Sequence, residues 1–191
     1  MRKAWILGVL AGAIIIFIGG AYLASPYFAA KALADAAQAG DKGKLDAMVD
    51  FPSVRDGLKS QFNAALTANM QNDPDMKDNP FAGLGMMMVP AIADRMVDAV
   101  VTPEGIARMA KARRSETTTT EPTPAPTSST KDDDTVHSYK YVTLDRFRAS
   151  AAAKSNLKQH VDFVFERRNL FTWKLVKIDM SDALLNTNAG T

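Results

Sequence analysis

The N-terminal segment constrains this chain most, because no charged residue occurs between Ala4 and Ala30. Its most apolar part, residues 4–24, would form a helix about 31 Å long, which matches the roughly 30 Å hydrocarbon layer of a bilayer. Arg2 and Lys3 precede it, and such positive charge stays on the cytoplasmic side. We therefore predict a single-pass helix in the cytoplasmic (inner) membrane, in contact with the lipid bilayer through residues 4–24. The N-terminus would lie inside and the main domain on the exported (periplasmic) side.

A cleaved signal peptide is the alternative interpretation of residues 1–25. Signal peptides have apolar regions of roughly 7–15 residues, shorter than this one, and end in small residues at the cleavage site. Gly19-Gly20-Ala21 is the best site of this kind, whereas Pro26 disfavours cleavage around Ser25. The chain has no cysteine, so a lipidated cysteine is excluded. The sequence leaves anchor and signal peptide open as alternatives.

The stretch after this segment predicts several helices. Ser25-Pro26 combines a capping residue with a first-turn proline and predicts the start of the first soluble helix. Gly40 is expected to end that helix. Further helices are expected to start near Asp41, Pro52 and Thr102.

A low-complexity segment follows at residues 115–135. It consists of Thr, Ser, Pro, Lys and acidic residues, with no apolar residue larger than alanine. Such a composition cannot bury enough surface to offset the entropy of ordering. We predict a disordered loop at 115–135 inside one domain that spans 26–181, followed by a flexible tail at 182–191.

The C-terminal part predicts strands at His137–Ala149, Leu157–Arg167 and Leu170–Met180. Short connections make these an antiparallel meander of three strands. One face of the meander is apolar, includes Trp173, and needs the helices as a cover. The expected fold class is therefore α+β: an N-terminal transmembrane helix, then a helical half packed on a three-stranded sheet.

Four stretches carry a resemblance to a known family: Ser25–Tyr27, Val49–Arg55, Tyr141–Phe147 and Glu166–Leu175. The chain resembles the bacterial family called domain of unknown function 2939, over nearly all of its length after the anchor. The resemblance implies an exported protein with an apolar N-terminal segment, and it implies no activity or catalytic residue. The order of helices before a meander is also similar to cone-like folds of the nuclear-transport-factor type, by analogy of fold alone.

Few residues suggest chemistry, and we predict no catalytic, cofactor-binding or metal site. The sequence has no cysteine, two histidines, and no phosphate-binding loop or serine elbow. Met86-Met87-Met88 could suggest Cu(I), but consecutive helical residues diverge, so these methionines, with Met96 and Met109, are expected to fill the core. Asp132-Asp133-Asp134 near His137 lacks the spacing of a calcium loop.

Asp50 and Arg55 are the candidate pocket residues, because they flank the start of a helix at Phe51-Pro52. They could line a pocket mouth, or they could be a structural pair of the kind common at helix starts. Basic residues concentrate in the strand region, but its aromatic residues are needed for the core, so we expect no nucleic-acid partner.

The favoured hypothesis for function is a membrane-anchored, exported accessory domain without catalysis. It would bind an unknown protein partner or a small apolar ligand. The alternative hypothesis is an exported enzyme with an acid/base pocket near Asp50 and Arg55.

Overall fold

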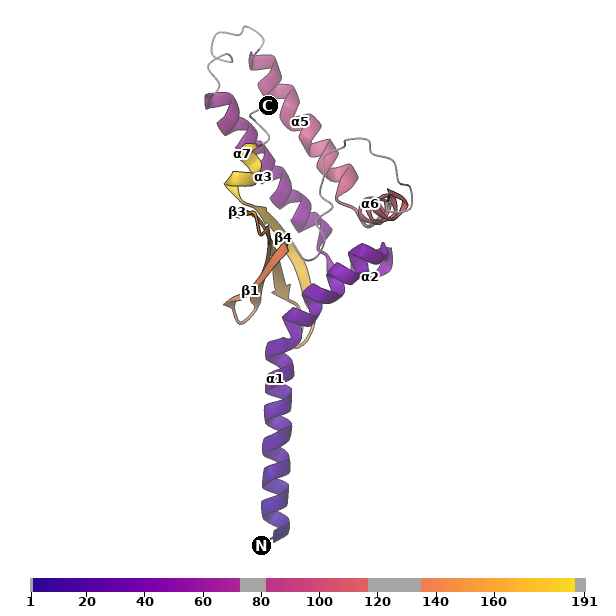
Figure 1. Ribbon diagram of the computed structural model, residues 1–191, viewed down its shortest axis with the longest axis vertical. Helices are drawn as coiled ribbons and strands as arrows, with labels where there is room; N and C mark the ends of the chain where they lie inside the picture. The colour runs from indigo at the N-terminus through magenta and orange to yellow at the C-terminus, as the bar shows by residue number, and fades with distance from the viewer. Residues whose placement is uncertain (1, 73–81, 117–134, 188–191) are drawn as a thin grey trace.

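The computed structural model describes residues 2–72, 82–116 and 135–187. The chain folds as an α+β protein in which a long N-terminal helix projects as a stem from the body (Figure 1). The helices are α1 (Arg2–Ala39), α2 (Lys42–Met48), α3 (Phe51–Asn72), α5 (Ala82–Val100), α6 (Pro103–Glu116) and α7 (Asp182–Thr187). The strands are β1 (Thr135–Thr143), β2 (Arg146–Ala153), β3 (Asn156–Arg167) and β4 (Trp173–Met180).

The stem and the first soluble helix are one element, so the prediction of a new helix start at Ser25-Pro26 is wrong. Pro26 lies inside α1 and has no N–H to bond the carbonyl of Tyr22, four residues earlier. The Ser25 hydroxyl donates to that carbonyl instead, at 2.8 Å. A substitute donor therefore lets the helix pass through a proline, and α1 bends between the stem and the body (Figure 1).

Gly40 ends α1, as predicted. Its φ of +67° is the left-handed conformation that glycine adopts without strain. The amides of Gly40 and Asp41 donate to Ala37 and Ala36, which closes the helix in a Schellman motif. Asp41 then caps α2 by accepting from the Lys44 amide at 3.1 Å. Hydrogen bonds from Lys44, first its amide and then its side chain, hold the pKa of Asp41 below the ordinary value.

The sheet has four antiparallel strands in the order β1-β2-β3-β4, so the expected count of three is wrong. The stretch expected as a single strand from His137 contains a turn at Leu144-Asp145, and the chain doubles back to form β2. The second half of β2 is Ala151-Ala152-Ala153. Alanine is depleted in strands, so the pattern of residues did not show that β2 continues.

Helices cover one face of this sheet and one of its edges. The residues just before α3 lie along β4: Val49 forms a parallel bridge with Leu175, and the Asp50 amide donates to the Leu175 carbonyl at 2.9 Å. Farther along α3, the Gln61 side chain donates to the Ile178 carbonyl at 2.7 Å and accepts from the Met180 amide at 2.9 Å. The edge strand β4 is thereby protected from pairing with another chain.

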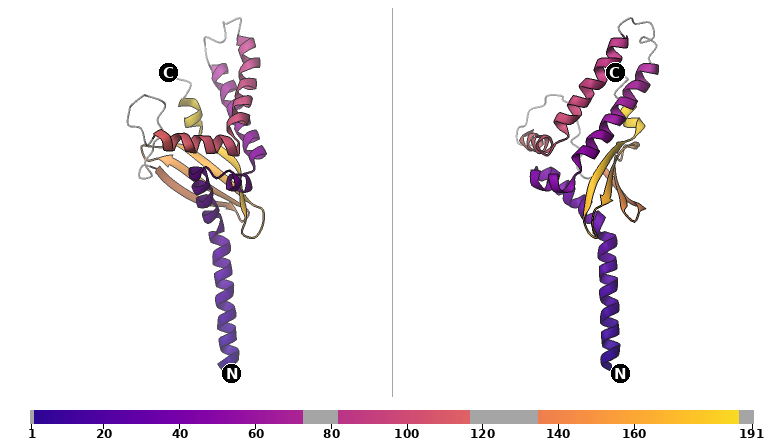
Figure 2. Two further views of the ribbon diagram at one scale, coloured as in Figure 1. Left: turned by 90° about the vertical axis from the view of Figure 1, so that its right-hand side faces the viewer. Right: turned by 180° about the vertical axis from the view of Figure 1, so that it is seen from behind.

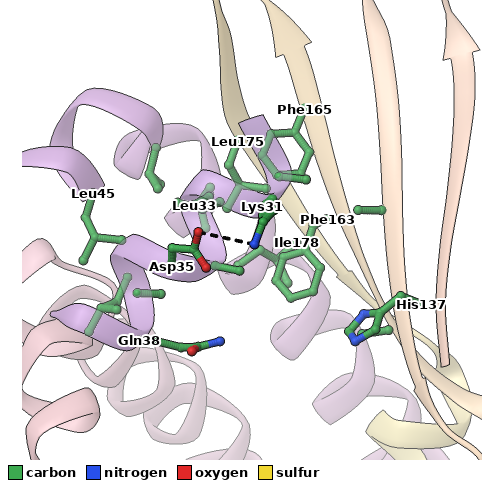
Figure 3. A pocket seen from close by; sticks show the side chains of 18 of the residues that line it. Lys31, Leu33, Asp35, Gln38, Leu45, His137, Phe163, Phe165, Leu175 and Ile178 are labelled. Atoms are coloured by element: carbon green, nitrogen blue, oxygen red, sulfur yellow. Dashed lines mark ion pairs between the residues drawn. The ribbon is translucent and has the colours of Figure 1, made fainter. Parts of the chain in front are cut away.

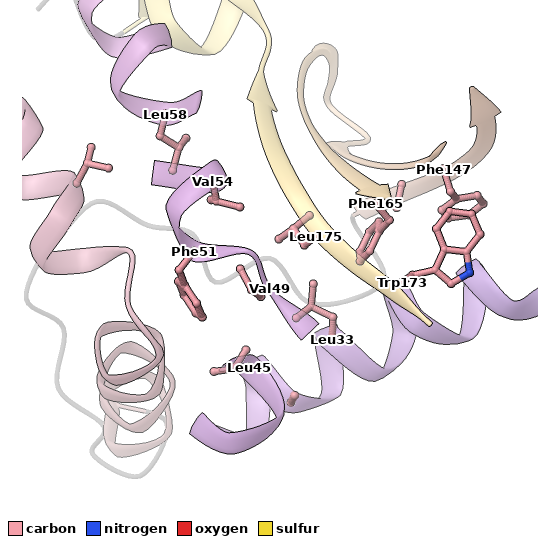
Figure 4. Close-up of a cluster of buried hydrophobic side chains, with 13 residues drawn as sticks. Leu33, Leu45, Val49, Phe51, Val54, Leu58, Phe147, Phe165, Trp173 and Leu175 are labelled. Carbon is pink, nitrogen blue, oxygen red and sulfur yellow. The ribbon is translucent and has the colours of Figure 1, made fainter. Parts of the chain in front are cut away.

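The core lies between the inner face of the sheet, α1 and the start of α3 (Figure 4). It includes Leu33, Leu45, Val49, Phe51, Val54, Leu58, Val97, Phe147, Phe165, Trp173 and Leu175. Trp173 is 2% exposed, which confirms its expected place in the core. Its indole N–H donates to Ser25 Oγ at 2.9 Å, which joins the last strand to the stem.

The remaining helices extend the body away from the stem. α3 and α5 run side by side at the end opposite the N-terminus, and α6 packs across α1 and α2 (Figures 1 and 2). Short helix α7 occupies residues that were expected to form a flexible tail. Most of the expected loop at 115–135 lies outside the described residues, between the end of α6 and the start of β1. The cone-like, nuclear-transport-factor-type analogy stays a prediction.

Candidate functional site: an apolar cavity between the stem helix and the sheet

A cavity of about 720 Å³ lies between the second half of α1 and the inner face of the sheet (Figure 3). Leu45 of α2, the start of α3 and the first turn of α6 complete its walls. Its floor is apolar and deeply buried, with Phe165 2% and Leu175 4% exposed. Phe163 and Ile178 lie beside them (Figure 3).

Small side chains on two facing walls explain why this space is empty. α1 contributes Ala30, Ala34 and Ala37, and β2 contributes Ala149 and Ala151. Protein interiors are otherwise packed to crystal density, so five methyl groups where larger side chains would fit leave a void. The alanine-rich sequences of α1 and β2 are therefore the signal that sequence reasoning could have used to find the cavity.

Polar residues occupy the more exposed side of the cavity. Lys31 and Asp35 lie one helical turn apart, with Nζ and Oδ2 3.7 Å from each other, and both side chains are more than half exposed. Gln38 from the same helix and His137 from β1 also line this side (Figure 3). The cavity thus pairs an apolar interior with hydrogen-bonding groups at its rim, the usual composition of a site for small molecules.

The two sequence candidates, Asp50 and Arg55, are not among the residues that line this cavity. Asp50 accepts from the Ser53 amide at 3.3 Å and pairs with Arg168 at 3.1 Å, so it caps α3 and ties it to the β3–β4 turn. Arg55 points to α5, where its Nε lies 3.8 Å from the Asp98 carboxylate. The two residues thus bind different structural partners.

Other residues singled out in the sequence take different places. Met96 and Met109 are 63% and 46% exposed, so their expected core role is wrong. Among the described side chains of α5, the buried one is Val97, one position along from Met96. Met88 is 55% exposed, and the side chains of Met86 and Met87 lie outside the described residues. Asp132-Asp133-Asp134 also lies outside them. No cluster of three metal-binding side chains occurs among the residues described.

Arg167 is a buried residue that the sequence did not reveal. Its guanidinium stacks on the Tyr22 ring of α1, 3.8 Å from the centroid, and on the Trp173 ring, at 4.2 Å. Its side chain is 7% exposed and pairs with Asp145 at 3.4 Å. The sequence placed Arg167 only at the end of a predicted strand in a basic region, whereas the structure shows that it joins the stem to the core.

α1 is the one described helix that is long and apolar enough to cross a membrane, judged by length and composition over Gly12–Ala39. The part of α1 that projects from the body exposes apolar side chains, and Ile15, Ile16 and Phe17 are each more than 70% exposed. The cavity begins at Tyr27, five residues beyond Tyr22, which is about 7–8 Å along a helix. The binding-site candidate therefore lies close to the end of the apolar segment.

Comparison with known proteins gives one match. No curated protein and no solved structure matches the chain significantly. A family model matches from within the apolar part of α1 to α6, which includes two of the stretches that carried the resemblance, Ser25–Tyr27 and Val49–Arg55. The other two, Tyr141–Phe147 and Glu166–Leu175, lie beyond the matched residues, so the match is shorter than expected. Over residues 15–109 the chain resembles the family described as Protein of unknown function (DUF2939).

Proposed function

We propose that this protein is a membrane-anchored, exported binding domain that holds the apolar part of a small amphipathic ligand in the cavity between α1 and the sheet. The cavity carries the proposal. Its volume of about 720 Å³ falls within the range of roughly 300–1,000 Å³ typical of sites for small molecules. Its alanine walls and aromatic floor favour an alkyl or acyl chain, and each buried CH₂ group contributes about 0.8 kcal/mol.

The rim favours a polar or anionic head group on that ligand. Lys31 and His137 offer donors there, and Gln38 offers both a donor and an acceptor. Asp35 partly neutralises Lys31 and disfavours a second negative charge nearby. A single-chain amphiphile with a small anionic head, such as a fatty acid, fits this distribution best.

The position of the cavity supports a ligand that comes from the bilayer. Arg2 and Lys3 favour a cytoplasmic N-terminus, which would place the body on the exported side of the inner membrane. Ser25 and Pro26 are buried in the body, so α1 is part of the folded core. Their burial supports an N-terminal segment that stays uncleaved. The proposed role needs no reaction at the site.

Photocrosslinking tests the proposal. Full-length protein in lipid nanodiscs is irradiated with a diazirine-bearing fatty acid, and adducts are mapped by mass spectrometry. We expect adducts on cavity residues such as Phe163 and Ile178, and their loss in Ala34→Trp, which places an indole in the space. Ala32→Trp is the matched control, since Ala32 is exposed on the same helix and does not line the cavity.

Equal labelling of both tryptophan variants would refute the cavity as the binding site. Labelling confined to residues 10–21 in every variant would mean that the probe reacts from the bilayer alone.

A further inference from the structure

Two turns of the sheet lie at the end of the body where α1 emerges. They are the β1–β2 turn at Leu144-Asp145 and the β3–β4 turn at residues 168–172. Their tips carry large apolar side chains in the open: Leu144 is 68% exposed, Leu170 69% and Phe171 52%. Solvent-exposed turns usually carry polar residues, so three such side chains at one end need an explanation.

Contacts fix these turns to a single residue of the stem. The Phe171 ring lies edge-on to the Tyr22 ring, with centroids 6.5 Å apart. Arg167, stacked on Tyr22, donates to the carbonyl of Leu144 at 3.2 and 3.3 Å and also to the carbonyl of Leu170. Both tips are therefore held at the level of Tyr22.

We propose that Leu144, Leu170 and Phe171 insert into the interfacial layer of the bilayer that α1 crosses. The inference rests on the anchorage that is part of the proposed function. If residues 4–24 span the hydrocarbon layer, Tyr22 lies at its outer boundary, where tyrosine and tryptophan rings concentrate. Phe171 touches Tyr22, and Leu23 beside it is 57% exposed, so lipid is the surface that these side chains meet.

The position of the two turns beside Tyr22 favours lipid over a protein partner. The chain itself places the turns against the membrane boundary, so a partner would have to displace head groups to reach them. Insertion of apolar side chains by about 5–10 Å is the depth at which interfacial anchors lie. With α1, the two turns would give the body three points of contact with the membrane and fix its tilt.

Depth measurements at single sites test the inference. The chain has no cysteine, so Leu144→Cys, Leu170→Cys and Phe171→Cys each create a unique attachment point for a nitrobenzoxadiazole fluorophore. Full-length protein is reconstituted in vesicles of phosphatidylethanolamine and phosphatidylglycerol that contain lipids with a spin-label quencher. We expect a blue-shifted emission at all three sites and strong quenching by the lipid-attached label.

Two controls bracket the result. Leu157→Cys is matched, because Leu157 is 61% exposed at the opposite end of the sheet, next to the β2–β3 turn, and should stay unquenched. Ile16→Cys, 77% exposed on the stem, reports whether the anchor is in the bilayer. Quenching at Ile16 with water-like spectra at all three turn sites would overturn the inference and leave the anchor intact. Water-like spectra at Ile16 as well would overturn both.

Discussion

The hydrogen-bonded relay through Ser25 makes the sharpest prediction. The Trp173 indole N–H donates to Ser25 Oγ at 2.9 Å, and the same hydroxyl donates to the Tyr22 carbonyl at 2.8 Å. Ser25→Ala removes both bonds while adding no bulk. The indole N–H is then buried without an acceptor, because Trp173 is 2% exposed. The carbonyl also loses its donor, because Pro26 cannot supply one.

The magnitude follows from these two orphaned groups. A buried donor left unpaired costs about 1–3 kcal/mol, and loss of the second, more accessible bond costs about 1 kcal/mol. We therefore expect Ser25→Ala to lower the free energy of unfolding by about 2–4 kcal/mol. For a domain of this size that corresponds to a fall in Tm of about 4–16 °C.

Calorimetric unfolding of the full-length chain in detergent micelles measures this effect. Ser60→Ala is the control, because Ser60 is exposed in α3 and its replacement should change stability by less than about 0.5 kcal/mol. A double-mutant cycle with Trp173→Phe isolates the indole bond, and we expect a coupling energy of about 1–2 kcal/mol. A coupling near zero, or equal effects of the two serine substitutions, would refute the relay.

Three further predictions concern other parts of the fold. Gly40→Ala should cost about 1–2 kcal/mol in unfolding free energy, because a side chain is strained at the φ of +67°; an unchanged urea midpoint would contradict this. Gln61→Leu should cost about 1–3 kcal/mol and speed amide exchange at Met180, since it unpairs two backbone groups of β4; unaltered exchange there would argue against the cap. Burial, opposed in part by the charge of Arg167, raises the pKa of the Tyr141 hydroxyl above 10.0. The unfolded chain then loses this proton first, so the stability that Tyr141 contributes is complete below pH 10 and falls as pH rises through the folded pKa. Tyr141→Phe should remove this part of the alkaline loss, as followed by thermal unfolding from pH 8 to 11, and identical pH profiles would contradict it.

Local rules of sequence predicted much of the fold. The strand predicted at Leu157–Arg167 is present as β3, and Gly40 marked the end of α1 through its backbone freedom. Features that depend on partners distant in sequence were not predictable in this way. The Ser25 hydroxyl that replaces the missing donor at Pro26 also accepts from the Trp173 indole, 148 residues away in the sequence.

The candidate site was harder to predict because small side chains, rather than reactive ones, create the cavity. The interior of the cavity is apolar and its charged residues, Lys31 and Asp35, lie at the exposed rim, whereas Asp50 and Arg55 drew attention although they bind structural partners. Met96 shows a different error: it was expected in the core, but the next residue, Val97, is buried and Met96 is 63% exposed. The spacing of apolar residues identifies one face of a helix, but tertiary packing decides whether that face is buried.

The unbroken α1 has a mechanical consequence. With no linker between the apolar segment and the body, the rotation of the body about the stem is set by the number of helical residues between them. One residue inserted after Ala21 would turn the body by about 100° and raise it by about 1.5 Å. Seven inserted residues would restore the original rotation to within about 20° but lift the body by about 10 Å. Insertions of one and seven residues therefore separate two variables that the native chain fixes together: the rotation of the cavity about the stem and, in the proposed membrane orientation, its height above the lipid.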